Sequence, residues 1–243
     1  MTDRVDIPGR YELKYWVPDD VMPNVLTFLG HFMEHDAHMP AGRPYKVTSL
    51  YFDTRDCTAY YEKYDGDNSR DKYRIRFYNN DTSRLFFEIK SKRGSFVTKI
   101  RCVIRNDDPI DEVVDGLRRG QYDDAVPDFA FYTRRMDFHP SVWTNYRRVA
   151  YVGINDPNLR ITFDHKLAGD VASAYQEGSF EFEPVAFSEW SPRRVMEIKY
   201  HSFFPFWLEN LMRELNIAQE PISKYGMVMK RCFFLVKEPA WTH

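Results

Sequence analysis

The feature that most constrains the fold is a regular alternation of charged and apolar residues that recurs along several short segments. In an extended strand, side chains two residues apart share a face. Lys72, Arg74 and Arg76 would therefore share one face of a strand, and the residues between them, aromatic or aliphatic, would share the other. Patterns of this kind predict strands over residues 10–16, 46–53, 72–78, 84–92, 96–105, 142–151, 160–164 and 194–200.

Few long helical segments separate these strands. Apolar spacing and start signals predict helices over residues 18–32, 57–64, 112–117, 129–137, 204–215 and 223–234, with 167–191 irregular or a weak hairpin. A regular alternation of strand and helix is missing, which favours an antiparallel sheet or barrel over a parallel α/β fold. Hydrophobic residues make up 43% of the sequence, enough for a core, and we expect residues 1–243 to form a single domain.

The charged faces admit two interpretations. Alternation by itself favours a sheet with one face on a core and the other in water, the ordinary antiparallel case. Two details favour the alternative. The polar faces carry mainly Arg and Lys with isolated Glu, and the apolar faces are rich enough to need covering helices. A sheet covered by helices on its apolar side can close with its charged side inward.

A cationic interior has a physical cost unless it binds an anion. Converging cations repel one another and lose hydration. Phosphate chains remove both costs, because Arg presents a planar fork to phosphate oxygens and Lys a compact charge. The few carboxylates among the cations suggest Mn²⁺ or Mg²⁺, which bind carboxylate and phosphate oxygens together.

Composition excludes several other classes of protein. A net charge of -2 gives no general reason to expect nucleic acid as a partner. No apolar run approaches the roughly 18 residues that cross a bilayer, and no secretory signal is evident. Three scattered cysteines argue against a disulfide framework or a zinc site, so we expect a cytoplasmic protein.

Nine short motifs occur in order along the chain. They are YELKYWVPD at 11–19, SLYFD at 49–53, YRIRFY at 73–78, EIK at 88–90, KIR at 99–101, YRRVAY at 146–151, RITFD at 160–164, MEIKY at 196–200 and SKYG at 223–226. As an ordered set, they resemble the VTC domain of polyphosphate polymerases, within the triphosphate tunnel metalloenzyme (CYTH-like) superfamily. Two positions differ from family patterns. Arg10 replaces the first Glu of the superfamily's opening ExExK motif, and Pro221 stands where some VTC members carry Lys.

The resemblance implies an α+β fold, a closed antiparallel eight-stranded β-barrel (a triphosphate tunnel) flanked by helices. Together with the strand parity, it assigns catalysis to Arg74, Arg76, Lys90, Arg148 and Arg160. The phosphate-binding set is Lys14, Lys72, Lys99, Arg101, Lys199, Ser223 and Lys224. Glu197 is the expected ligand of Mn²⁺ or Mg²⁺, with Glu12 beside it. The expected partners are ATP or another triphosphate and polyphosphate, and membrane-associated partner proteins stay unknown.

Three functions fit such a tunnel. The first is a polyphosphate polymerase-like transfer of the ATP γ-phosphoryl group to a polyphosphate chain, which requires mainly positioning and charge stabilisation. The second is hydrolysis of tripolyphosphate or a nucleoside triphosphate, with Glu12 or Glu88 orienting water. The third is a module that binds polyphosphate or nucleotide without turnover.

Three other features of the sequence have simpler explanations than a place in the phosphate site. His31, Glu34, His35 and His38 are expected on the polar end of a surface helix, where a metal site is the less favoured interpretation. Asp53 is expected either to pair with a tunnel cation or to cap the end of its strand. The aromatic run at residues 203–207 is expected to pack into the core.

Overall fold

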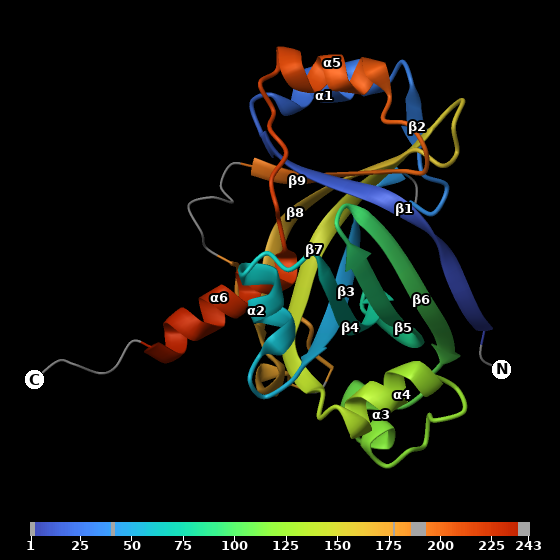
Figure 1. Cartoon of the computed structure of the whole chain (residues 1–243), viewed down its shortest axis with the longest axis vertical. Coiled ribbons are helices and arrows are strands. Elements are labelled where there is room, and N and C mark those ends of the chain that lie inside the picture. Colours follow the sequence, from blue (N-terminus) through green and yellow to red (C-terminus); the bar gives the residue numbers. More distant parts are fainter. Residues whose placement is uncertain (1–2, 40–41, 177, 186–192, 238–243) are drawn as a thin grey trace, which may run out of the picture.

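The strands of the molecule form one antiparallel sheet that closes into a barrel (Figure 1). The computed structural model describes residues 3–39, 42–176, 178–185 and 193–237. The strands in that part of the chain are β1 (Asp3–Pro18), β2 (Met33–His35), β3 (Tyr45–Asp53), β4 (Ser69–Tyr78), β5 (Asp81–Arg93), β6 (Phe96–Arg105), β7 (His139–Gly153), β8 (Arg160–Val171) and β9 (Arg193–Tyr200). The helices are α1 (Met22–Leu29), α2 (Thr58–Tyr64), α3 (Ile110–Arg118), α4 (Pro127–Arg135), α5 (Phe206–Glu214) and α6 (Lys224–Lys237), with a 3-10 turn at Ala172–Ala174.

The strand order is β2-β7-β3-β4-β5-β6-β1-β9-β8, and an additional pairing of β7 with β8 closes the ring. Eight strands therefore form the closed barrel, and β2 is an extra strand that pairs with the last residues of β7. This arrangement confirms the predicted fold class. Every neighbouring pair is antiparallel. The charged face of each strand lies on the same side of the sheet as that of its neighbours, all around the ring.

Helices cover the apolar outer faces of the barrel at two sides. Figure 1 shows α1 and α5 above β1, β8 and β9, and α3 with α4 below β4, β5 and β6. The upper cluster joins Met22, Val25, Leu208 and Leu211 to Ile161, Phe163, Met196 and Ile198. The lower cluster joins Ile110, Val113, Leu117 and Phe129 to Ile75, Phe77, Phe87 and Ile89. Burial of these outward-facing residues leaves the charged positions of the same strands inside the barrel.

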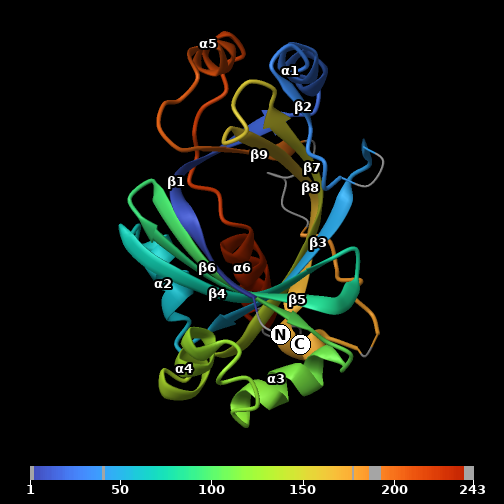
Figure 2. The same cartoon turned by 90° about the vertical axis from the view of Figure 1, so that its right-hand side faces the viewer.

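The last helix lies at one end of the barrel. Figure 2 views the molecule along the barrel and shows the start of α6 within its outline, at the far end. Tyr225, Val228 and Met229 pack there against Tyr51 of β3 and Tyr146 of β7. The chain enters this helix through residues 219–223, which pair with β1 where Tyr15 bridges to Gln219.

Two predicted boundaries were wrong. The helix expected over residues 18–32 ends at Leu29, and β2 follows, pairing with the end of β7. Strand β1 begins at Asp3, because a bulge between Ile7 and Arg10 absorbs the Pro8-Gly9 dipeptide that otherwise signals a turn. A Cβ on Gly9 would lie 2.2 Å from the Phe96 ring, so a larger residue at this bulge would require that exposed ring to move.

The aromatic run before α5 was also predicted incorrectly. Phe203 and Phe206 are 89% and 72% exposed, so these two rings do not belong to the core. Phe204 and Trp207 do pack inward, and the Trp207 ring stacks on Phe32 at 4.3 Å. Across the described part of the chain, no helix combines the length and the apolar character needed to cross a membrane.

Candidate functional site

The barrel encloses a cavity of about 260 Å³ whose lining comes from all eight barrel strands, α2 and residues 219–225. Fifteen of the lining residues are Lys or Arg and three are Glu. All of the site residues predicted from the sequence line this one cavity: Glu12, Lys14, Lys72, Arg74, Arg76, Lys90, Lys99, Arg101, Arg148, Arg160, Glu197, Lys199, Ser223 and Lys224. Their functional roles remain predictions.

Glu88 organises the cations of β4 and β6. Its side chain is fully buried behind the cavity lining. One oxygen accepts hydrogen bonds from Lys99 Nζ at 3.0 Å and Arg101 Nε at 2.8 Å, and the other accepts from Arg74 Nε at 2.8 Å. Arg76 lies 3.7 Å from the same carboxylate. Burial opposes ionisation of Glu88, but these four cations outweigh it and hold its pKa well below the usual range.

Asp164 plays the same part on the opposite wall. Arg148 donates to both of its oxygens, at 2.6 and 2.8 Å, and Lys224 Nζ lies 2.6 Å away. The carboxyl is fully buried, and although burial opposes its ionisation, Arg148 and Lys224 lower its pKa to about 2. Because Lys224 is the first residue of α6, this ion pair also joins the helix to β7 and β8.

Glu12 and Glu197 differ from that buried pair, because both line the cavity. Glu12 accepts hydrogen bonds from Lys90 and Arg10. Glu197 has only looser ion pairs, to Lys199 at 3.3 Å, Arg148 at 3.6 Å and Lys14 at 4.0 Å. Burial opposes ionisation of both, but Lys90 lowers the pKa of Glu12 to about 2, and Lys199 with Lys14 holds the pKa of Glu197 well below its usual range.

Several lysines of the lining are crowded and desolvated. Burial lowers the pKa of Lys14 to about 7, despite the attraction of Glu197. Lys99 has a pKa of about 7 for the same reason, despite Glu88. Burial and neighbouring cations also lower the pKa of Lys72 well below its usual value. An anion in the cavity would remove the unfavourable part of this environment.

Two of these lysines also hold the segment that leads into α6. Lys14 Nζ donates to the Ile222 carbonyl at 3.1 Å, and Lys72 Nζ donates to Ser223 Oγ at 2.8 Å. The backbone N–H of Glu220 donates to the Lys14 carbonyl at 2.9 Å. Ser223 and Lys224 are therefore placed in the cavity by contacts with β1, β4 and β8.

The carboxylates that face the cavity fit a divalent metal only in part. No group of three or more His, Cys, Asp or Glu side chains gathers in ligand geometry among the described residues. Mg²⁺ typically binds one or two carboxylates and completes its shell with water and substrate phosphates. Glu197 accepts no strong hydrogen bond, and Glu12 is close enough to raise the energy of charging both. This pair therefore fits a metal that arrives with phosphate.

The remaining sequence hypotheses are resolved differently. Asp53 caps α2, accepting backbone N–H groups of Thr54, Ala59 and Tyr60 together with the Tyr225 phenol. His31 to His38 lie in turns and in β2, not on a helix, because α1 ends at Leu29. Asp36 from this segment instead reaches Arg160 Nε at 2.9 Å and positions it at the cavity.

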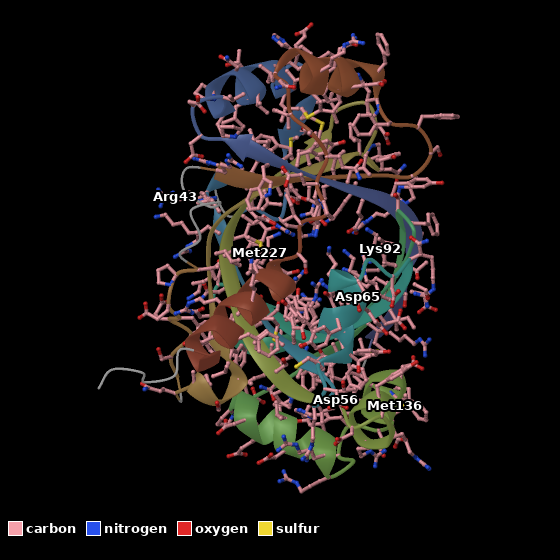
Figure 3. All side chains as sticks on the ribbon, turned by 60° about the vertical axis from the view of Figure 1, so that its left-hand side comes forward. Arg43, Asp56, Asp65, Lys92, Met136 and Met227 are labelled. Carbon is pink, nitrogen blue, oxygen red and sulfur yellow. The ribbon has the colours of Figure 1, made fainter. Side chains whose placement is uncertain are left out.

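Sequence reasoning missed part of the lining. Arg10, Lys63, Arg70, Lys92, Tyr51 and Tyr146 all reach the cavity. Arg10 and Lys92 had the inward parity that could have identified them. Figure 3 shows Lys92 at the end of β5, on the same side of the molecule as Asp65, which follows α2. Cations occupy the oxygens of Glu88 and Asp164, and some of these cations come from distant segments. No local sequence pattern could have identified these partners.

The chain is similar to known proteins in sequence and in structure. The family model of the VTC domain matches residues 9–233. A putative adenylyl cyclase from Hippeastrum, HpAC1, described as having a dominant triphosphatase activity, has a similar structure. Its TM-score is 0.50 at 14% identity, over 92% of this chain and 96% of that chain. The PH1819 protein from Pyrococcus horikoshii OT3 gives a TM-score of 0.48 at 14% identity, over 91% and 99% of the two chains.

The fold is thus that of the triphosphate tunnel (CYTH-like) proteins, and the family match covers nearly the whole chain. The chain belongs to the VTC domain family.

Proposed function

We propose that this protein is a metal-dependent phosphotransferase that moves the γ-phosphoryl group of ATP onto a polyphosphate chain inside the barrel. The observation that carries this proposal is the excess of positive charge along the cavity. Fifteen Lys or Arg side chains line it, against Glu12, Glu197 and Glu220 in the lining and Glu88 and Asp164 behind it. Counted by residue type, the cations exceed these five carboxylates by ten, although burial leaves Lys14 and Lys99 only partly charged at pH 7 in the empty cavity. A bound polyanion favours the charged forms of these lysines.

The residues divide the work by position. Arg74 and Arg76 are fixed by Glu88, and Arg148 is fixed by Asp164, so their guanidinium groups are already oriented before a phosphate arrives. Preorganised donors of this kind stabilise the charge of a transferring phosphoryl group without reorganisation during the reaction. Lys90, Lys99 and Lys199 add compact charges along the path. Holding donor and acceptor phosphates in line is the main requirement of such chemistry.

Tunnel metalloenzymes generally use divalent metals, and Glu197 with Glu12 would hold Mn²⁺ or Mg²⁺ here. A bound divalent ion supplies neutralisation of phosphate charge. The protein's own part is to present two ionised carboxylates among lysines, which their low pKa values ensure at neutral pH.

The second candidate is hydrolysis of a triphosphate, favoured by the triphosphatase activity described for the structurally similar HpAC1. A hydrolase needs a group that orients water. Glu88 is poorly suited, because cations occupy both of its oxygens. Glu12 is also engaged, by Lys90 and Arg10. The structure therefore favours a phosphate acceptor over water, and a binding module without turnover is the third outcome.

The test is incubation of the protein with ATP and Mn²⁺ or Mg²⁺, followed by gel separation of the products. A ladder of polyphosphate with ADP supports the proposal. Orthophosphate without chain growth would establish the hydrolase instead. Absence of both products over a range of metals, with tight polyphosphate binding, would leave the binding module.

A further inference from the structure

The two ends of the cavity have different chemistry. At the end where β4 begins, Arg70 is the cross-strand neighbour of Lys92 on β5. Lys63 of α2 also lines the cavity at this end. Tyr78 lies at the other end of β4, next to its turn into β5, and also lines the cavity. Its cross-strand neighbour on β3 is Val47, two residues from Tyr45. One end is therefore cationic, and the opposite end is lined by the Tyr78 ring.

The aromatic end contains three rings from three adjacent strands. The ring centroids of Tyr78 and Tyr45 are 5.9 Å apart, and those of Tyr78 and Phe86 are 5.4 Å apart, both edge to face. Two guanidinium groups lie over Phe86, Arg101 at 5.0 Å and Arg84 at 5.3 Å from its centroid. These rings and planar cations form an aromatic rim, defined here as Tyr45, Tyr78, Phe86 and Arg84. Tyr78 is the member that lines the cavity, and the other three surround it.

The rim is linked directly to the phosphate-binding cations. Arg101 contacts Phe86 and also donates to Glu88, the centre that fixes Arg74. Arg160, another lining cation, donates to the Tyr45 hydroxyl at 3.4 Å. A ligand held at the rim would therefore have its attached phosphates next to Arg101 and Arg160.

From this juxtaposition we propose that the aromatic rim is a nucleobase subsite, which takes the base of a nucleoside triphosphate such as ATP while the phosphates extend toward the cationic end. Nucleobases stack on aromatic side chains and on guanidinium planes. An inorganic phosphate chain has no π-face, so the rings contribute nothing to holding it. The inference rests on the proposed function in that ATP is the donor. It orients the nucleotide in the cavity, with the base at the aromatic rim and the phosphates toward the cationic end.

Packing at the barrel end is the plainer role for these rings, and the two roles predict different behaviour. A purely structural ring would affect ATP and tripolyphosphate binding equally, because both ligands carry the same three phosphates. A stacking ring would affect ATP alone. For each ligand, the dissociation constant of the variant is divided by that of the wild type. The discriminating quantity is the ATP value of this ratio compared with the tripolyphosphate value.

The experiment measures binding of ATP and of tripolyphosphate by calorimetry, with EDTA present so that no turnover occurs. The variants are Tyr78→Leu and Phe86→Leu, with Tyr78→Phe as the variant that keeps a ring. Lys92→Gln at the cationic end is the matched control. We expect each Leu variant to weaken ATP about tenfold, in line with the loss of one stacking partner, and to change tripolyphosphate less than twofold.

Tyr78→Phe should retain ATP affinity, and Lys92→Gln should weaken tripolyphosphate at least as much as ATP. Equal losses for both ligands in the Leu variants would overturn the subsite, and so would unchanged ATP affinity. If the Tyr78 variant fails to fold, the Phe86 variant decides the question by the same ratio. Because the readout is binding, a protein that makes no polyphosphate can still pass or fail this test.

Discussion

Two pairs of carboxylates share the inward face of the barrel and do different work. Glu88 and Asp164 are fully buried, and cations occupy their oxygens at hydrogen-bonding distance. Glu12 and Glu197 line the cavity, and the contacts of Glu197 with its cations are 3.3 Å or longer. The comparison teaches that residue type alone does not distinguish a carboxylate that only holds cations from one that faces the cavity. What distinguishes the two pairs is access to the cavity, which Glu12 and Glu197 line and from which Glu88 and Asp164 are buried.

The largest expected effect is on stability in the buried pair. Replacing Glu88→Gln leaves Arg74, Arg76, Lys99 and Arg101 without their shared counter-charge. We expect the free energy of unfolding to fall by about 3–5 kcal/mol, the usual cost of breaking a buried ion pair. Urea unfolding measures it, with Glu197→Gln as the control. Equal losses in the two variants would erase the distinction between the pairs.

A second prediction concerns turnover by a variant of Glu197, the residue whose replacement should affect stability less than that of Glu88. Glu197→Gln removes a cavity carboxylate while the fold keeps both buried centres, so the protein should stay folded. We expect its metal-dependent turnover of ATP to fall about 100-fold, the scale of losing one preorganised electrostatic group. Steady-state kinetics over a series of Mn²⁺ concentrations would show this. Wild-type turnover in a folded Glu197→Gln protein would remove Glu197 from the site.

A third prediction is that phosphate binding takes up protons. Lys14 and Lys99 have pKa values of about 7 in the ligand-free cavity, and a bound polyanion favours their charged forms. Affinity for tripolyphosphate should be greatest below pH 7 and fall above it, by at most about tenfold per pH unit for each lysine. Calorimetry in buffers with different ionisation enthalpies counts the protons. Affinity that rises from pH 7 to 8 would contradict these pKa directions.

A fourth prediction concerns the stability of the ligand-free protein. Between pH 7 and 9, Lys14 and Lys99 bind fewer protons folded than unfolded, where the usual value is 10.5. The unfolded state then holds more protons, so the free energy of unfolding should rise with pH across this window. Saturating tripolyphosphate should flatten the rise, because the lysines are then charged in the folded state as well. Chemical denaturation at several pH values would measure both curves.

Strand parity is a local property, so the sequence predicted which residues share a face. It placed Lys72, Arg74 and Arg76 on one face and Lys90 with Lys92 on another without any knowledge of strand order, and both faces line the cavity. Parity alone favoured a face in water. The order itself was not predictable from periodicity, since β1 pairs with β6 and with β9, far away in the sequence. Family resemblance supplied the closed barrel.

What local pattern could not reveal were the features made by distant segments. The second cation of Asp164 is Lys224, which lies at the start of α6, 60 residues later in the sequence. The short strand β2 has three residues and exists through its pairing with β7. The exposure of Phe203 depends on how α5 packs, and composition alone favoured burial.

The fate of the γ-phosphorus of ATP tests the central claim most directly. The protein would be given ATP labelled at that position, Mn²⁺ and a short polyphosphate primer, and the label would be traced to polyphosphate or to orthophosphate. The account predicts that most of the label enters chains longer than the primer, in amounts equal to the ADP formed. Label recovered as orthophosphate, with primer length unchanged, would contradict it.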